Sequence, residues 1–501
     1  MLLSHRRLFA VIAILAVGVC VYACGRQERP NTPIKMRIGI GIPKRGTPGS
    51  GLSSVIGSLV SEPWLGTRTD GKQSERLMSA FTVDETGTKV RLTVRPNVLF
   101  QDGTPLTADL ASEALKKSIA DKEALSFTSI EAVRVLDPRT IEIDLKSPNS
   151  FLLSDLSLVL VRKPGRPKIG AGPFRVVSQD GQQAVLAAFP RYYRGRPQID
   201  EIDITTYPTQ RAAWAALMRG EIDMLYEVSR EATDFVRAES SVRTFDFPRA
   251  YYIPLVFNVR REPLRSVKIR QAINEALDKA VLVAEGLNGQ GSSADGPILR
   301  GHWAYTPPPQ PFNYNLEVAR TLIESSGLAQ PPGDGRPGRI SFECLVFADD
   351  SRFERLAMLV QKQLADVDIE MKLVPLPQDK LEERLGSGDF DAYLFEMFGR
   401  SLSYSYELWH SHVPARNNTG YTAADAVLDR MREAHSDPEM KTGVAEFERI
   451  LHDDPPAAFI AWQRASRAVS TRFDVLPERD RDILSNVWQW RQVEPTALAS
   501  R

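Results

Sequence analysis

The sequence is poor in cysteine and has no excess of charge of either sign. Only three cysteines occur in 501 residues, Cys20, Cys24 and Cys344, so a disulfide framework is excluded. The 63 lysines and arginines equal the 63 aspartates and glutamates. A generally basic nucleic-acid-binding protein is excluded, because phosphate binding requires a surplus of cations on some face. A disordered acidic chain is excluded too, since 43% of the residues are hydrophobic and can form sizeable cores.

Recognisable catalytic motifs are also missing. The sequence has no G-x-S-x-G elbow, no HExxH helix and no Cys/His pairing in a catalytic context, which argues against a secreted hydrolase. His410 and His412 have a metal-like spacing, because side chains at i and i+2 of a strand point to one face. The surrounding WHSHVP is better interpreted as a loop. We therefore predict a binding protein with no catalytic residue, no metal ligand and no cofactor.

The chain has a single long apolar run, Leu8–Val21, which follows the basic residues Arg6 and Arg7. The run is shorter than the ~20 residues needed to span a bilayer, but it has the length of a signal-peptide core. It ends at Ala23-Cys24-Gly25, which resembles a bacterial lipobox. We predict a lipoprotein-type signal peptide at 1–23, lipidation of Cys24 and a polar tether at 24–35. The alternative is a signal anchor that stays uncleaved. In both cases the rest of the chain lies outside the inner membrane, and Cys344 is expected to be a small buried apolar residue.

Strand and helix patterns alternate along the rest of the chain. Period-two alternation of apolar residues predicts strands at Lys89–Val94, Thr140–Leu145 and Glu201–Thr205. Helical spacing predicts helices at Val267–Val283 and at Glu317–Ser326, the second ending at Gly327. This mixture indicates α/β or α+β layers.

Five segments carry a family resemblance. In Val90–Ser118 a strand leads to a turn at Asp102-Gly103 and then to a helix capped by Thr107. The other segments are Gly170–Tyr226, Phe257–Gly289, Tyr314–Gly327 and Asp389–Pro456. In this order they resemble extracellular solute-binding protein family 5 of ABC importers, which includes the dipeptide- and oligopeptide-binding proteins.

The resemblance implies an α/β fold of the two-lobe periplasmic binding protein type II-like class, with mixed sheets and flanking helices. Lobe I would hold residues 36–250 plus 466–501, and lobe II residues 251–465. The hinge would lie near Arg249–Leu255 and Ser466–Thr471. A ligand would bind in the cleft between the lobes, and the closed monomer would dock on the permease and ATPase subunits of an importer. The implied location is the periplasm or cell envelope.

The expected cleft departs from the peptide-binding pattern. In peptide-binding members, the stretch matching Tyr393–Trp409 carries a Trp and then an Asp that holds the ammonium terminus of the peptide. Here Phe398 takes the Trp position, and no carboxylate follows before Glu407. A buried ammonium group without a partner costs several kcal/mol. Arg400 instead offers a fork for a carboxylate or a phosphate.

The predicted ligand-binding residues are Phe398, Arg400, Ser401, Tyr404, Asn417 and Asn418. Each has a structural alternative: Arg400 can be solvated or can bridge the lobes, the aromatic rings can pack in a core, and the asparagines can turn a loop. By family default the cargo is a peptide or peptide-like solute. The alternatives are a non-peptide anionic or hydroxyl-rich solute, or a sensor or scaffold lipoprotein that has lost transport.

Overall fold

The computed structural model describes residues 33–41, 51–228, 232–308, 310–328, 340–413 and 418–493. The predicted signal peptide, Cys24, most of the predicted tether and Asn417 lie outside the described residues. Within the described part of the chain, no helix combines the length and the apolar character needed to cross a membrane.

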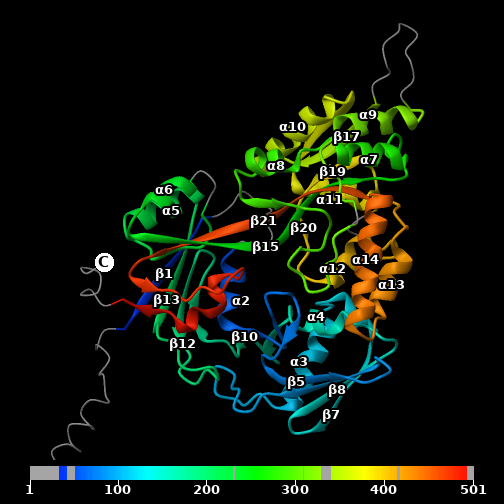
Figure 1. The fold of residues 1–501 in the computed structure, drawn as a ribbon. Coiled ribbons are helices and arrows are strands. Elements are labelled where there is room, and N and C mark those ends of the chain that lie inside the picture. The colour runs from blue at the N-terminus through cyan, green and yellow to red at the C-terminus, as the bar shows by residue number, and fades with distance from the viewer. Residues whose placement is uncertain are drawn as a thin grey trace, which may run out of the picture.

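Two long antiparallel strands, β15 (Val242–Phe257) and β21 (Ala457–Ser470), connect two halves of the molecule (Figure 1). They are the centre of a 12-stranded sheet whose main order is β11-β12-β13-β1-β14-β21-β15-β19-β17-β18. The strands on one side of the pair belong to the first lobe, and those on the other side to the second. Their pairing shifts register between Pro248 and Tyr252, within the predicted hinge. The two-lobe α/β fold is confirmed, while the residue boundaries of the lobes stay a prediction.

The first-lobe part of this sheet is built around β1 (Lys35–Gly41) and β13 (Glu201–Tyr207), which pair in parallel. The predicted strand at 201–205 is confirmed and continues to Tyr207. The neighbouring elements are β11 (Phe174–Gln179), β12 (Gln183–Ala188), β14 (Met224–Leu225), α2 (Leu52–Val60), α5 (Gln210–Met218) and α6 (Thr233–Ala238).

A separate four-stranded antiparallel sheet, in the order β5-β6-β8-β7, lies at the far end of the first lobe (Figure 1). Its strands are β5 (Met78–Val83), β6 (Lys89–Val94), β7 (Ile130–Asp137) and β8 (Thr140–Leu145). The bounds of β6 and β8 confirm the two strands predicted from alternation. Helix α3 (Ala108–Ala120) packs on this sheet, and the predicted cap is confirmed, because Thr107 accepts a hydrogen bond of 3.3 Å from the Leu110 N–H.

Short strands form three further small sheets, β10-β9-β2, β3-β4 and β22-β23. Their bounds are β2 (Glu62–Pro63), β3 (Gly66–Thr67), β4 (Gln73–Ser74), β9 (Leu160–Lys163), β10 (Arg166–Gly170), β22 (Phe473–Asp474) and β23 (Arg491–Gln492).

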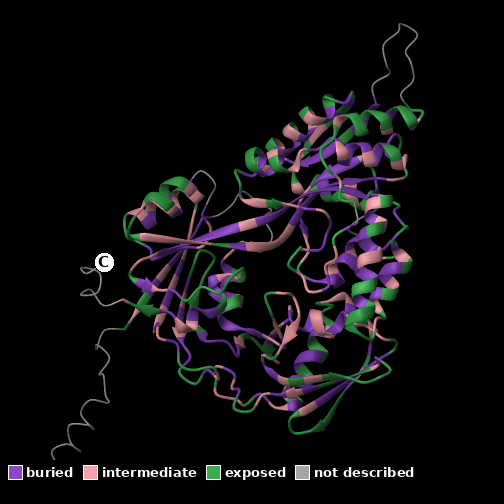
Figure 2. Cartoon of the chain, in the orientation of Figure 1, coloured by how far each residue is buried: buried purple, intermediate pink, exposed green. Residues whose placement is uncertain are grey.

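The second lobe packs helices against β17 (Ile340–Phe347), β18 (Ile369–Leu376) and β19 (Ala392–Leu394). Its buried apolar residues form one cluster, and Figure 2 shows buried residues in purple along these strands and helices. Cys344 is fully buried in this core as a free thiol, and burial raises its pKa, so it acts as the small apolar residue that was predicted. The helices are α7 (Val267–Glu275), α9 (Leu316–Ser325), α10 (Ser351–Ala365), α11 (Gln378–Ser387), α13 (Asp425–Arg432) and α14 (Asp437–Asp453).

The prediction of one helix over Val267–Val283 is wrong. Helix α7 ends at Glu275, and a second short helix, α8 (Lys279–Val281), begins after Asp278. The Asp278 carboxylate accepts a 3.0 Å hydrogen bond from the Val281 N–H, which starts a new helix in place of the old one. The apolar periodicity continues across this break, because Leu277 before it and Leu282 and Val283 after it are buried in the same core, and periodicity alone does not reveal the break. The predicted end of α9 is confirmed, since Gly327 has a φ of 74°.

The lobes touch each other away from the hinge. The Ser150 N–H, which precedes α4 (Leu152–Leu156) of the first lobe, donates to the Arg432 carbonyl at 2.7 Å. At a second contact between the lobes, the Trp303 N–H donates to the Asp70 carbonyl at 2.8 Å. Phe151 packs with the buried residues of the second lobe. The lobes are therefore in contact on more than one side of the space between them.

Candidate functional site

A cavity of about 980 Å³ lies between the lobes and against the two crossing strands. The first lobe contributes residues within 58–76, 157–160 and 479–485, and the second lobe contributes residues within 297–302 and 398–405. The crossing strands contribute residues within 247–251 and 462–467. The cavity is within the size range of small-molecule sites, ~300–1,000 Å³.

Phe398 is one of the predicted site residues that line this cavity. It lies on β20 (Met397–Phe398), which pairs with β15 so that Phe398 is opposite Tyr251. The two ring centroids are 5.1 Å apart in an edge-on arrangement. Tyr404 packs edge-on against Phe398 at 4.4 Å but is not itself in the cavity wall. Tyr404 thus supports the wall, and Phe398 and Tyr251 present its aromatic surface.

The backbone at Gly399 determines where Arg400 lies. The Gly399 N–H donates to the Ala250 carbonyl at 2.8 Å. A Cβ at this position would lie 2.5 Å from the Trp462 ring, so only glycine allows so close an approach. The chain then turns away, and the Arg400 side chain is exposed to the cavity.

Arg400 makes no hydrogen bond or ion pair with any residue that the structure describes. Desolvation by the surrounding protein, together with the neighbouring Arg481 guanidinium, lowers the pKa of Arg400 from its ordinary value. Asp482 and Tyr404 act on it in the opposite direction but do not pair with it. An arginine pKa is so high that the group keeps its charge. Arg400 is therefore a cation that presents free donors to the cavity.

The other charges of the cavity wall are paired. Arg467 contacts Asp482 at 2.7 Å, and Arg249 lies 4.0 Å from Glu227. The other pairs are Arg68–Asp70, Arg76–Glu62, Arg95–Glu75, Arg479–Asp480 and Arg481–Glu478. Each carboxylate in the described wall has an arginine within 4.0 Å, so none is free to receive an ammonium group. Among the described wall arginines, Arg400 is the one without a carboxylate.

Ser401 lines the cavity, but its hydroxyl already has a partner. It lies 2.6 Å from the Ser403 hydroxyl, which donates to Asp155 of the first lobe at 2.5 Å. All three side chains are buried. Burial raises the pKa of Asp155, and hydrogen bonds from Ser126 and Ser403 oppose that rise. This chain of hydroxyls links α12 (Leu402–Trp409) of the second lobe to α4 of the first.

The predicted asparagines are not brought to the cavity. Asn418 is exposed in the second lobe, where its side-chain amide donates to the Gly386 carbonyl at 3.2 Å and its backbone carbonyl accepts from Arg260. This arrangement corresponds to the loop-turning alternative. Asn417 lies outside the described residues.

His410 and His412 follow α12 in a turn and not on a strand. Together with Asp425 they offer ligand atoms that lie within 4.8 Å of one another. These atoms already have internal partners: His410 Nδ1 accepts from the His412 N–H at 3.1 Å, and both Asp425 oxygens accept from Ser411. The cluster is explained as the hydrogen bonding of a turn.

Sequence reasoning missed several wall residues, including Trp462, Arg467 and Arg481. Trp462 and Arg467 lie on β21, Arg481 follows that strand, and all three are far in sequence from the Tyr393–Trp409 stretch. No local motif indicates this position. A possible signal was the expectation that residues after 465 return to lobe I, which places them beside the cleft.

Comparisons with known proteins agree with this geometry. A family model described as "Bacterial extracellular solute-binding proteins, family 5 Middle" matches residues 62–418. The chain is 25% identical over 544 residues to the oligopeptide-binding protein AppA of Bacillus subtilis (strain 168), covering 96% of this chain and 98% of that protein. It is 23% identical to the glutathione-binding protein GsiB of Pectobacterium atrosepticum, covering 85% and 88%.

Solved structures show the same fold. NikZ from Campylobacter jejuni, solved in complex with Ni(L-His), superposes with a TM-score of 0.76 at 19% identity, covering 91% of this chain and 99% of that one. AppA from Bacillus subtilis, solved with a nonapeptide, gives a TM-score of 0.71 at 20% identity, covering 92% and 100%.

Proposed function

The chain belongs to family 5 of the bacterial extracellular solute-binding proteins, the solute-binding components of ABC importers, and we propose that it is a lipid-anchored member that delivers an anionic or hydroxyl-rich solute to a permease. The observation that carries the proposal is Arg400, an unpaired guanidinium facing a cavity whose other described charges are paired.

The charge balance of the wall favours this cargo over a peptide with a free amino terminus. An ammonium group entering the cavity would meet no unpaired carboxylate among the described wall residues. It would have to break an existing pair, such as Arg249–Glu227 at 4.0 Å, or remain without a partner. A carboxylate or phosphate would instead find the free fork of Arg400. A peptide-like cargo is compatible with the site when its amine is blocked and its anionic group meets Arg400.

The aromatic wall would hold the apolar part of the cargo. Phe398 and Tyr251 present faces on which a planar or aliphatic group can pack. Relatives named for oligopeptides, D,D-dipeptides, glutathione and heme show that the family alone does not fix the cargo.

Capture is a shift between two conformations. The open form admits the solute, and solute contacts with both lobes favour the closed form. The closed form removes the solute from bulk water, which strengthens the bond to Arg400. A micromolar ligand has a binding free energy of ~8 kcal/mol, enough to favour a closure that costs a few kcal/mol.

Lipidation of Cys24 would hold the two lobes at the membrane through the 24–35 tether, within reach of the permease and ATPase subunits. A signal anchor that stays uncleaved would place them in the same position. Mass spectrometry of the membrane-extracted protein distinguishes the two, since cleavage and acylation leave Cys24 as the modified first residue.

Isothermal titration with a matched pair of tripeptides tests the cargo class: one has a free amine, and the other is N-acetylated with the same free carboxylate. The proposal expects tighter binding of the acetylated member and recovery of both peptides unchanged. Preference for the free amine would overturn the assignment of an anionic cargo, and cleavage of either peptide would overturn the binding-only function. A transport-inactive sensor is the second candidate. It is distinguished by solute uptake that does not change when the gene is deleted.

A further inference from the structure

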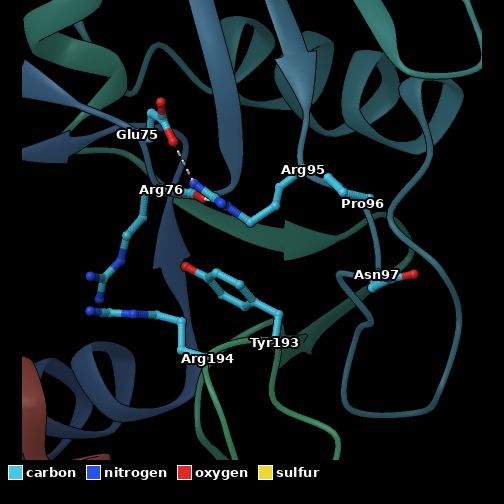
Figure 3. Close-up of a pocket in the computed structure, with 7 residues that line it drawn as sticks. All are labelled: Glu75, Arg76, Arg95, Pro96, Asn97, Tyr193 and Arg194. Carbon is cyan, nitrogen blue, oxygen red and sulfur yellow. Dashed lines mark hydrogen bonds and ion pairs between the residues drawn. The ribbon is translucent and has the colours of Figure 1, made fainter.

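A second, smaller pocket of about 460 Å³ lies beside the cleft in the first lobe (Figure 3). Its wall is made of Glu75, Arg76, Arg95, Pro96, Asn97, Tyr193 and Arg194, and we call it the arginine pocket. Glu75 and Arg76 also line the main cavity, so the two spaces are neighbours that share one wall.

The three guanidinium groups of the arginine pocket are held in different ways. Arg76 pairs with Glu62, which is buried behind it. Arg95 donates from Nε to the Arg76 carbonyl at 2.6 Å and from Nη2 to Glu75 at 3.1 Å. Arg194 lies 5.1 Å from the Trp488 ring, and it forms no hydrogen bond or ion pair with any residue described. With two carboxylates against three guanidinium groups, the pocket keeps an excess of positive charge.

Tyr193 adds a neutral donor at the centre of this group. Its hydroxyl is buried and has no hydrogen-bond partner among the described residues. In Figure 3 the hydroxyl points toward the side of the pocket where Arg76 and Arg95 lie. Burial, and after it the Glu62 carboxylate, raises the pKa of Tyr193 to about 12, while Arg76, Arg194 and Arg95 each act to lower it. The hydroxyl stays protonated and can donate.

A buried donor without an acceptor is unfavourable, and its cost is removed when an acceptor enters. The acceptor that suits a neutral hydroxyl and two or three guanidinium forks is an oxygen anion with several lone pairs. We infer that the arginine pocket binds the oxyanion group of a small molecule, a phosphate or a carboxylate, held by Arg95, Arg194 and the Tyr193 hydroxyl. This site goes beyond the proposed function, because it does not depend on Arg400.

The oxyanion can be a free anion of the envelope or the end of a solute that also occupies the main cavity, since the two spaces share a wall. The probe for both is inorganic phosphate, titrated at constant ionic strength into the mature protein freed of co-purified solute. Repeating the titration on protein that keeps its co-purified solute distinguishes a free anion from an anionic group of the solute. A free-anion site binds phosphate equally in both preparations, whereas a site filled by the solute binds it only in the first.

Two variants test the arginine pocket without breaking any ion pair between the described residues. Arg194→Gln removes an exposed guanidinium that pairs with no described residue. Tyr193→Phe removes only the hydroxyl. We expect saturable phosphate binding by the wild type, a Kd about tenfold weaker in Arg194→Gln and several-fold weaker in Tyr193→Phe, as for a charge-assisted and a neutral hydrogen bond. Arg355→Gln, at an exposed position of α10 in the other lobe, is the matched control and should leave the Kd unchanged.

The main-cavity variant Arg400→Ala distinguishes this site from the proposed function. Phosphate binding that survives Arg400→Ala and is weakened by Arg194→Gln supports the arginine pocket. Phosphate binding that is lost in Arg400→Ala and kept in Arg194→Gln assigns the anion to the main cavity and overturns the inference. No saturable binding by the wild type overturns it as well. Crystals soaked in selenate provide a direct readout, with anomalous density expected between Arg95, Arg194 and Tyr193.

Discussion

Substituting Ser403→Ala should favour the open conformation without weakening either lobe. Ser403 donates its hydroxyl proton to Asp155 across the lobe boundary at 2.5 Å, and both side chains are at most 2% exposed. Without this donor, the Asp155 carboxylate would remain buried in the closed form with one bond fewer. In the open form, water can replace the lost donor. The substitution therefore acts on the equilibrium between the two conformations.

The expected size follows from the cost of a buried acceptor that loses its donor, about 1–3 kcal/mol, which corresponds to a change of about 5- to 150-fold in the closed-to-open ratio. Where the cargo-free protein is mostly open, cargo affinity falls by the same factor, because binding must then supply the energy of closure. Single-molecule energy transfer between one dye on each lobe measures the ratio directly.

Ser112→Ala is the matched control. Ser112 is also buried, but its hydroxyl has no partner among the described residues and lies within the first lobe. It should leave the closed-to-open ratio unchanged. If Ser403→Ala and Ser112→Ala give the same ratio as the wild type, the bond between Ser403 and Asp155 does not stabilise closure, and the reasoning is refuted.

Three further substitutions test single features of the structure. Burial, with a smaller effect from Asp295, raises the pKa of Glu448 from 4.5 to about 8, so the folded state keeps a proton that the unfolded state loses. The free energy of unfolding should fall as pH rises from 4.5 to 8, by up to ~1.4 kcal/mol per pH unit from this group. Glu448→Gln should remove this pH dependence, measured by urea titrations at a series of pH values. An equal pH dependence in the wild type and the variant would contradict the burial argument. Gly399→Ala should weaken cargo binding more than it lowers stability, because the new methyl group meets the Trp462 ring and displaces the cavity wall. Titration calorimetry measures the affinity and thermal melting the stability. An unchanged affinity would show that the Trp462 ring moves aside at no cost to binding. Thr107→Ala should lower the free energy of unfolding by about 1 kcal/mol through loss of the α3 cap. An unchanged urea midpoint would show that this cap does not stabilise the folded state.

Features determined by neighbouring residues were predictable from the sequence. The strands at Lys89–Val94 and Thr140–Leu145 alternate because one face of each meets a core, and Thr107 caps its helix through a bond three residues away. The two-lobe fold followed from the resemblance of five segments, each of which combines turn and packing signals.

Features that depend on distant parts of the chain were not predictable. The break at Asp278 leaves the apolar periodicity intact, because Leu277 before it and Leu282 and Val283 after it are buried in one core. Phe398, Arg400 and Ser401 line the cavity, yet the Ser401 hydroxyl is already hydrogen-bonded to Ser403. The remaining wall charges come from segments that the topology brings together, so their pairing was visible only in three dimensions.

Native mass spectrometry of the wild type and of Arg400→Ala, each offered the same extract of small molecules, tests the central claim most directly. The account predicts that the wild type retains a small anionic solute, that the solute is released with its mass unchanged, and that Arg400→Ala retains little or none of it while keeping the same melting temperature. Equal retention by the two proteins, or a solute released with a changed mass, would contradict it.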